Sequence, residues 1–461
     1  MVLKKYIGTK EFYRNLFSIA LPIMLQNGIS NFVGLLDNLM VGRIGTEQLA
    51  GVSIANNLMF VYQLCIFGAV SGAGIFTAQF FGQNNKKGIQ DTFRIKLVLA
   101  LCLTALGIGL FLLFDKSLIS LYLHEGSDSG DLNLTLSCGH AYIMTMLFGL
   151  LPQGIEMSYS STLRETGETV VPMRASLIAV AVNLCLNYIL IYGKFGAPAL
   201  GVTGAALATV IARFVQAGIV VSWLHRNTDK MPYAKGVFAS FAIPKDLLCK
   251  VMVTGAPLIL NETMWALGVV IQSQSYSTRG LAVVAATNIN STIYTVVSIC
   301  YVAFGDAVAI IVGQHLGAGR MDEAGEDSSK ILFFTVCSCI VFGAIVFFTA
   351  GLYPMMYNTT DEVKSIAESI IRVTGLVMPI HGACHCLYFT IRAGGKTLIT
   401  FLFDSVFMMV VAVPVAYVLT RLTSLDIVTV YALVELTSAI KVAIGAVMLK
   451  SGIWMQNIVS E

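Results

Sequence analysis

Ala-Gln-Phe-Phe-Gly at residues 78–82 returns in the second half of the chain as Gly-Gln-His-Leu-Gly at residues 313–317. With Gln79 aligned to Gln314, the first register, a long segment of the chain matches itself without a gap. Identical pairs in this register include Pro22/Pro257, Leu25/Leu260, Gly45/Gly280, Ala50/Ala285, Ile54/Ile289, Cys65/Cys300, Ile75/Ile310, Gln79/Gln314 and Gly82/Gly317. Apolar helices often match by chance in Leu and Ile but rarely in Pro, Gln and Gly, so the alignment indicates an internal repeat.

A second register covers the later part of each copy. It pairs Arg164, Gly167 and Thr169 with Arg392, Gly395 and Thr397. Each half therefore contains six predicted helices in the same order. Because an even number of helices separates corresponding positions, the two copies have the same orientation, which predicts a parallel repeat.

The composition is that of a membrane protein, because 56% of the 461 residues are hydrophobic and only 12% are charged. A bilayer core takes roughly 20 apolar residues per spanning helix. Twelve stretches are long enough, near residues 15–40, 48–77, 92–115, 137–163, 170–193, 202–224, 247–276, 285–313, 330–354, 364–392, 398–421 and 426–449. We predict an all-α integral membrane protein with twelve transmembrane helices in two homologous six-helix lobes.

The predicted lobes meet at a polar linker. Residues 1–225 form the expected N-terminal lobe and residues 247–461 the C-terminal lobe. The segment 226–246 is basic and contains Pro232 and Pro244, which predicts a cytoplasmic linker. Two lobes around a central cleft suit alternating access.

The placement of Lys and Arg predicts the orientation in the membrane. With the N-terminus inside, 20 of the 29 basic residues fall in inner segments and 7 in outer segments. The positive-inside rule therefore places both termini in the cytoplasm. The first apolar stretch is too long for a signal-peptide core, so we expect a retained helix in the cell membrane.

Several function classes are excluded. The ten cysteines lie almost entirely in apolar stretches, which predicts no structural disulfides. No Gly-rich loop followed by Lys and Ser or Thr is present, so the chain itself does not hydrolyse ATP. Its energy must come from an ion gradient or from the gradient of its substrate. We find no nucleophile with a base, so we do not expect an enzyme.

Asp37 is the first candidate functional residue, because apolar residues flank it on both sides. An ionisable group in the bilayer core costs at least roughly 2.5–3.5 kcal/mol. The functional interpretation is a carboxylate that exchanges a proton or Na⁺ for substrate. The alternative is a carboxylate at a helix end, exposed to the outer interface.

Asn183 and Asn187 share one helix face through their i, i+4 spacing. Their amide oxygens could bind Na⁺ beside a carboxylate, and their donors could hold a protonated Asp. Interhelical hydrogen bonds that only join helices are the alternative.

Glu262 follows Pro257 and pairs with Asn27 in the first register. It is either a cation or substrate ligand or a buried, hydrogen-bonded carboxylate. Other charged residues within the predicted helices could snorkel or pair across helices: Asp306, Asp404, Glu156, Glu435, Arg213 and Lys441.

His381 and His385 lie on one helical face near Cys384, but Cys386 points elsewhere. A single membrane helix rarely closes a metal site, so we expect no metal. A packing or proton-sensing role for His381 is preferred.

With these features, the chain resembles the multidrug and toxic compound extrusion (MATE) family, in its prokaryotic, DinF/NorM-like form, over nearly its whole length. The matching phrases are Ala-Leu-Pro-Ile-Met (20–24), Asp-Asn-Leu-Met-Val-Gly-Arg-Ile-Gly (37–45), Leu-Ala-Gly-Val-Ser (49–53), Arg-Glu-Thr-Gly-Glu-Thr (164–169), Leu-Gly-Val-Thr-Gly-Ala-Ala-Leu-Ala-Thr (200–209) and Val-Gly-Gln-His-Leu-Gly-Ala-Gly (312–319). The resemblance implies a V-shaped pair of lobes and export of amphiphilic, often cationic, compounds in exchange for Na⁺ or H⁺.

The resemblance also implies a cation-coupling site in the N-terminal lobe. Asp37, Asn183, Asn187 and Thr209 fall where the family pattern has its ligands, with Asn187 in place of an Asp that many prokaryotic relatives carry. The NorM branch adds a Glu and an Asp in the C-terminal lobe. Glu262 matches the Glu. His381, and not an Asp, stands near the position of the family's Asp. We therefore expect coupling in the N-terminal lobe first.

The expected partners are small organic substrates and the lipid bilayer, with no nucleic acid and no cofactor beyond the coupling ion, and a monomer suffices. The alternative function is a lipid-linked oligosaccharide flippase, which needs a basic cavity for pyrophosphate. Only Arg213 and Lys441 lie in mid-helix, which disfavours it.

Overall fold

A computed structural model describes residues 6–123, 131–240 and 242–460, and all regular structure in these ranges is helical. Ten long single helices cross the membrane: α1 (Lys10–Gly42), α2 (Thr46–Gly82), α3 (Lys86–Ser120), α4 (Leu132–Glu165), α5 (Val170–Tyr192), α6 (Gly201–Arg226), α7 (Lys245–Ser277), α8 (Leu281–Gly317), α9 (Met321–Thr349) and α11 (Asp361–Ala393). Two further spans, Thr397–Leu422 and Ile427–Ser451, complete twelve in the described part of the chain. The predicted all-α membrane fold is confirmed.

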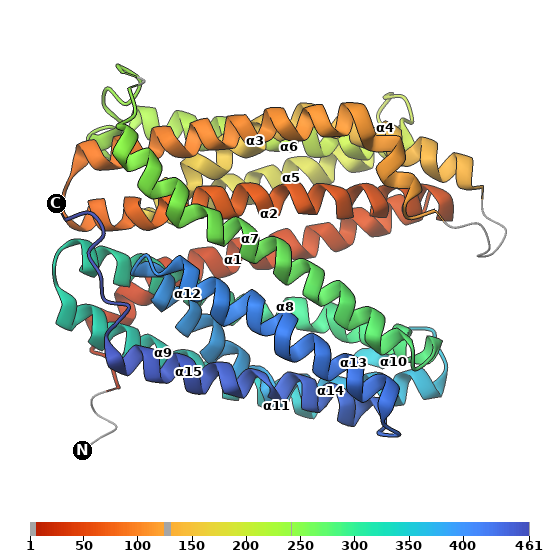
Figure 1. Ribbon diagram of the computed structural model, residues 1–461. Helices are drawn as coiled ribbons and strands as arrows, with labels where there is room; N and C mark the ends of the chain where they lie inside the picture. Colours follow the sequence, from red (N-terminus) through yellow and green to blue (C-terminus); the bar gives the residue numbers. More distant parts are fainter. Residues whose placement is uncertain (1–5, 124–130, 241, 461) are drawn as a thin grey trace. The chain divides into compact units, whose positions relative to one another are not determined.

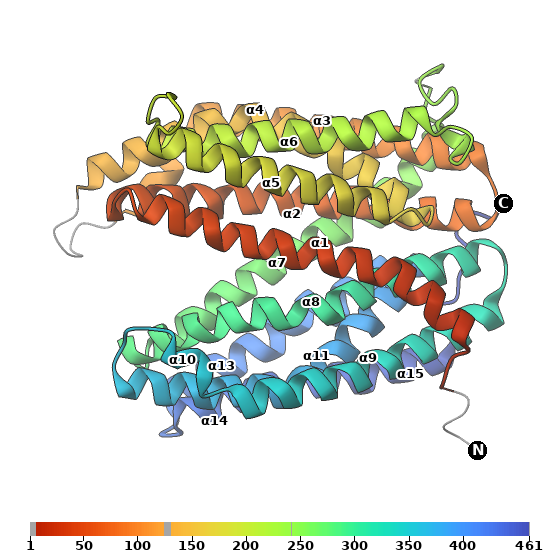
Figure 2. The same ribbon diagram turned by 180° about the vertical axis from the view of Figure 1, so that it is seen from behind.

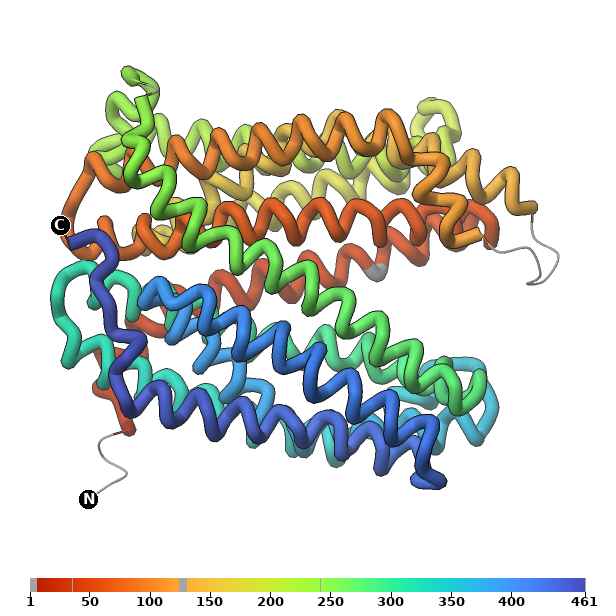
Figure 3. The backbone as a smooth tube through the Cα atoms, viewed as in Figure 1, coloured from red at the N-terminus to blue at the C-terminus, as the bar shows by residue number. Residues whose placement is uncertain are grey.

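The last two spans are assembled from shorter pieces. The first consists of α12 (Thr397–Phe401), two π-helical turns, η3 (Leu402–Val406) and η4 (Met408–Ala412), and α13 (Val413–Leu422). The second consists of α14 (Ile427–Leu436) and α15 (Ser438–Ser451), and the remaining short elements are η2 (Pro232–Ala234) and α10 (Leu352–Met355). Figure 3 traces the backbone through residues 397–422 as one continuous helix. Single π-helical turns occur often at functional sites.

The chain divides into two compact units. Unit 1 contains Met1–Met24, Ala78–Asn85 and Val253–Glu461, and unit 2 contains Leu25–Thr77 and Lys86–Met252. In unit 2, helices α3, α4, α5 and α6 lie along one another, as Figures 1 and 2 show from opposite sides. In unit 1, α11 packs against α8, α9, α14 and α15. The predicted lobe boundaries at residues 225 and 247 stay a prediction.

Each unit is held together by interdigitated apolar side chains. In unit 2 the core includes Ile143 and Leu150 of α4 and Ala206 of α6, all with no solvent exposure. In unit 1 Phe304 of α8 and Ile391 of α11 are buried in the same way. These helices are rigid supports for the polar side chains that the cores surround.

The two phrases that define the repeat pack against each other within unit 1. A Cβ atom added to Gly82 would collide with the carbonyl oxygen of Gln314, and one added to Gly317 would collide with that of Gln79. The fully buried Gln79 side chain donates to the Ala393 carbonyl at 2.9 Å. Glycine is therefore required at both positions by close backbone approach.

Candidate cation sites

Asp37 lies near the C-terminal end of α1, and its side chain is partly buried. The Nδ2 atom of Asn187 on α5 donates to Asp37 Oδ1 at 2.6 Å. Among the described residues no Lys, Arg or His forms an ion pair with this carboxylate. The carboxylate is therefore held by an amide and not by a countercharge.

The other predicted residues of this site join the same hydrogen-bond chain. Asn187 Nδ2 also donates to Asn183 Oδ1 at 3.2 Å, and Asn183 Nδ2 donates to Thr209 Oγ1 on α6 at 3.2 Å. Asn183 and Asn187 are 5% and 1% exposed. Their i, i+4 spacing on α5 places one amide above the other, as the sequence predicts. The structure thus brings together Asp37, Asn183, Asn187 and Thr209, from three helices.

One oxygen of this hydrogen-bond chain receives no hydrogen bond within the described residues. Asn187 Oδ1 is buried and accepts no hydrogen bond within the described residues. A buried acceptor without a partner costs on the order of 1–3 kcal/mol. Amide and carboxylate oxygens are hard ligands, so a proton on the carboxylate or a small cation near it would satisfy this chemistry.

Tyr142 of α4 belongs to the same region, although the sequence did not indicate it. Its buried hydroxyl is hydrogen-bonded to the side chains of Asn56 and Thr209 and interacts electrostatically with Asp37. It is one of 17 tyrosines. No spacing or motif distinguishes it, since its place beside Thr209 follows only from the packing of α4 against α6.

A second polar cluster lies in unit 1 around Asp404, on the π-helical turn η3. Lys441 Nζ of α15 lies 2.6 Å from Asp404 Oδ1, and Asn261 Nδ2 of α7 donates to Asp404 Oδ2 at 3.2 Å. Ser405 Oγ donates to Asn261 Oδ1 at 2.7 Å, and Asn261 Nδ2 also reaches the Tyr388 hydroxyl at 3.2 Å. The amide of Asn261 therefore fixes the carboxylate that the ammonium meets.

Glu262 lies next to this cluster and is partly buried. Its carboxylate is hydrogen-bonded to Asn261 and interacts electrostatically with Arg392 and Asp404. The Arg392 guanidinium lies over the rings of Tyr388 and Phe389, 5.9 and 5.1 Å from their centroids. Glu262 thus has a basic residue in its surroundings, in contrast to Asp37.

His381 of α11 contacts α14. Its Nε2 atom lies 2.9 Å from Glu435 Oε2, which permits an ion pair when the imidazole is protonated. The ring meets Tyr294 edge-on, with 5.9 Å between centroids. His381 is therefore part of a packed, partly polar contact between helices.

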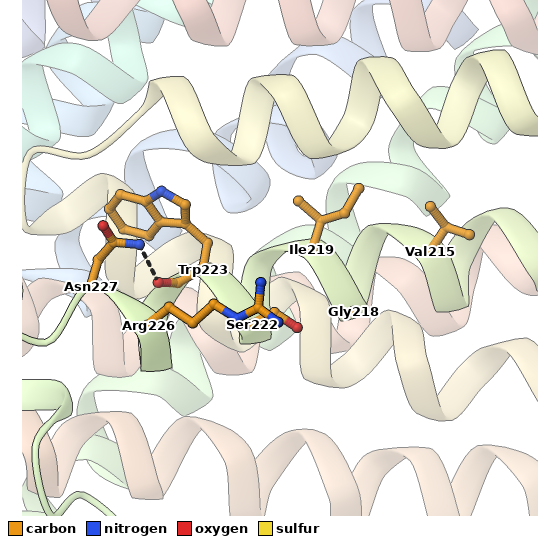
Figure 4. A pocket seen from close by; sticks show the side chains of 7 residues that line it. All are labelled: Val215, Gly218, Ile219, Ser222, Trp223, Arg226 and Asn227. Atoms are coloured by element: carbon orange, nitrogen blue, oxygen red, sulfur yellow. Dashed lines mark hydrogen bonds between the residues drawn. The ribbon is translucent and has the colours of Figure 1, made fainter.

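A surface hollow along α6 is unrelated to these clusters. It is lined by Val215, Gly218, Ile219, Ser222, Trp223, Arg226 and Asn227, along the C-terminal half of that one helix and just beyond its end (Figure 4). The hydrogen bond drawn there, from Asn227 Nδ2 to the Trp223 carbonyl at 2.8 Å, is internal to the helix end. Without polar groups converging from several helices, the hollow does not have the form of a ligand site.

In the described part of the chain, twelve helices long enough to span a membrane and carboxylates within them define an integral membrane protein with polar sites inside its helices. The chain belongs to the MatE family, whose model matches residues 22–189 and 257–418. The two matches begin at Pro22 and Pro257, a pair that the first register aligns, which confirms the internal repeat. Proteins of this family are transporters and not enzymes, as the sequence predicted.

Similar proteins cover most of the chain. A probable multidrug resistance protein NorM of Thermotoga maritima is 24% identical over 89% of this chain and 86% of its own length. A probable multidrug resistance protein YoeA of Bacillus subtilis is 25% identical, over 91% and 89%. A MOP superfamily transporter from Pyrococcus furiosus has the same fold, with a TM-score of 0.86 at 17% identity and 97% coverage of both chains.

Proposed function

We propose that this protein exports amphiphilic, often cationic, organic compounds in exchange for H⁺ or Na⁺ by alternating access, with Asp37 as the carboxylate that takes up the exchanged cation. Two relatives carry the words multidrug resistance in their names, which supports the substrate class. The observation that carries the proposal is the hydrogen-bond chain from Asp37 through Asn187 and Asn183 to Thr209.

The polar groups of this hydrogen-bond chain are suited to reversible binding of a cation. An ionised Asp37 without a basic partner is unfavourable in an apolar surrounding, so a proton or Na⁺ that neutralises it is bound. The amide of Asn187 can donate a hydrogen bond to the carboxylate through its nitrogen, or bind a cation through its oxygen. Uptake and release of one positive charge at this point would then bias the protein between states that bind and release substrate.

The remaining parts of the proposal follow from the predicted organisation. Lobes 1–225 and 247–461, joined by the linker 226–246, would exchange access between the two sides of the membrane. Glu262 and His381 would serve as secondary cation or substrate contacts. The protein would act as a monomer in the cell membrane, with both termini in the cytoplasm and no cofactor besides the coupling ion.

A flippase for lipid-linked pyrophosphates is a weaker proposal. Such a substrate needs basic side chains that are free to bind phosphate oxygens. Lys441 is paired with Asp404, and Arg392 interacts with Glu262. These two cations are thus already engaged by carboxylates.

The test is efflux of a fluorescent organic cation from proteoliposomes that carry either a Na⁺ gradient or a pH gradient. We expect one gradient to drive efflux by the wild type and Asp37→Asn to reduce it to below about a tenth, because the variant cannot take up a positive charge. If neither gradient drives efflux, antiport of organic cations is wrong for this protein.

The matched control is Asp426→Asn. Asp426 is an exposed N-cap residue outside the spanning helices, and Asn caps helices as well as Asp does. The same change of side chain at this position should leave efflux at the wild-type rate. Efflux that survives Asp37→Asn unchanged would place coupling elsewhere, with Glu262 tested next.

A further inference from the structure

Lys441 lies in a site made for a cation. Its ammonium lies 2.6 Å from Asp404 Oδ1, and the side chains of Lys441 and Asp404 are 14% and 21% exposed. The rings of Phe403 and Phe407 lie 5.4 and 6.0 Å from Nζ, within the range of cation–π attraction. A carboxylate and two aromatic rings thus lie within reach of one positive charge.

The second carboxylate oxygen of Asp404 also has a partner. The second carboxylate oxygen, Asp404 Oδ2, accepts a hydrogen bond from Asn261 Nδ2 at 3.2 Å. Asn261 is in turn held by Ser405, whose hydroxyl donates at 2.7 Å to its amide oxygen. With both oxygens of Asp404 engaged, the carboxylate is oriented toward the ammonium.

The repeat relates this lysine to the candidate coupling site. In the second register, which pairs Arg164 with Arg392, Thr437 and Lys441 stand opposite Thr209 and Arg213. Arg213 lies one turn after Thr209, which belongs to the Asp37 hydrogen-bond chain. Lys441 likewise lies one turn after Thr437, the counterpart of Thr209. In unit 2, however, Arg213 Nη1 contacts the Gly149 carbonyl at 3.5 Å and interacts with Glu156, which leaves Asp37 without a basic partner.

We propose that Lys441 is a built-in cation, whose ammonium permanently occupies the site formed by Asp404 and Asn261 near the rings of Phe403 and Phe407. A primary alkylammonium is the ligand class that this site takes when the side chain is removed. The inference deepens the proposed function and rests on it in one respect, because it leaves Asp37 as the place of the exchangeable cation. The site itself stands on geometry and is testable without transport.

The experiment uses the full-length protein with Lys441→Ala, which removes the three methylenes and the ammonium beyond Cβ. n-Propylammonium has this same structure. We expect it to raise the Tm of the purified variant in detergent by about 3 °C with a saturable dependence, since a ligand that binds the folded state stabilises it. The wild type, whose site is filled, should shift by no more than it does in NaCl of equal ionic strength.

Two controls isolate the charge. n-Propanol has the same chain without the charge and should not raise the Tm of Lys441→Ala. The double variant Lys441→Ala/Asp404→Asn lacks the carboxylate and should not respond to n-propylammonium. A shift in Lys441→Ala that is absent, or that is equally large in the double variant or with n-propanol, would overturn the proposal.

A second measurement serves if Lys441→Ala is too unstable to purify. Membranes are then solubilised with and without n-propylammonium, and the monodisperse fraction is compared by size-exclusion chromatography. We expect at least about a twofold gain for Lys441→Ala and none for Lys441→Ala/Asp404→Asn. Equal recovery in both would reject the built-in cation. Because neither readout involves efflux, failure of the proposed antiport would leave this result interpretable.

Discussion

Asp37 in unit 2 and Asp404 in unit 1 are both carboxylates inside membrane-spanning segments, yet their partners differ. The closest partner of Asp37 is the Asn187 amide at 2.6 Å, and that of Asp404 is the Lys441 ammonium at the same distance. An amide leaves a carboxylate in need of a positive charge, whereas an ammonium satisfies it. The two related halves thus differ at these carboxylates, since an amide holds one and an ammonium holds the other.

The largest effect is expected from Asp404→Asn, which would leave the Lys441 ammonium without its carboxylate. Breaking one side of a buried pair typically costs about 3–5 kcal/mol, and this pair, with side chains 14% and 21% exposed, should lose less than that but more than an exposed pair. Asp37→Asn orphans no cation and should change the free energy of unfolding by less than about 1 kcal/mol. Reversible unfolding in SDS of both variants measures the difference. Equal losses would mean that the two carboxylates do not differ as described.

A smaller effect is expected in a double-mutant cycle of Asp404→Asn and Lys441→Met. Removing both charges leaves neither partner unpaired, so the double variant should lose about 2 kcal/mol less than the sum of the single variants. The same cycle with Asp37→Asn and Lys441→Met should be additive, because the two residues lie in different units. Unfolding free energies of the five variants and the wild type supply both cycles, and additivity in the first would exclude a functional ion pair.

Asn187→Asp should increase the difference between the surroundings of Asp37 and those of Asp404. The expected change is a higher cation affinity at Asp37. A second carboxylate beside Asp37 raises the local negative charge, which favours binding of H⁺ or Na⁺ by about tenfold. The cation concentration for half-maximal efflux should fall accordingly. Asn133→Asp is the control, because Asn133 is exposed in the first turn of α4 and does not belong to the hydrogen-bond chain of Asp37. An unchanged half-maximal concentration in Asn187→Asp would remove this amide from the coupling site.

The smallest effect lies outside both regions, at Asp426, the N-cap of α14. Its Oδ2 accepts from the Thr429 backbone N–H at 3.0 Å, and Asp426→Ala should cost about 1 kcal/mol. Hydrogen bonds from Thr429 lower the pKa of Asp426 below its ordinary value of 3.8. The cap therefore stabilises fully above that value, and its contribution is lost as the pH falls through the lowered pKa. Unfolding of both proteins at pH 7 and near pH 3 measures it, and efflux should be unaffected.

Much of this organisation could be predicted from the sequence, because hydropathy and self-alignment report directly on spanning helices and on a repeat. The i, i+4 pair Asn183 and Asn187 was visible as a shared face, and the resemblance to a known family placed Asp37 and Thr209 beside it. These four side chains do meet in the structure. Their role in coupling stays a prediction.

The cluster around Asp404 could not be assembled from the sequence in the same way. Its members come from α7, η3, α11 and α15, and which side chains meet depends on helix packing that no local pattern encodes. One signal was available, since the second register pairs Arg213 with Lys441. Two mid-helix cations at equivalent positions are unexpected by chance, and they point to the last helix of each half.

The contact between the repeated phrases has the symmetry of a dimer interface. Gly82 meets the Gln314 carbonyl, and Gly317 meets the Gln79 carbonyl, so each copy offers the same surface to the other. That reciprocity is the mark of an isologous, twofold contact between identical subunits. In this protein one polypeptide supplies both sides of that twofold contact, because the two phrases are copies of one repeat.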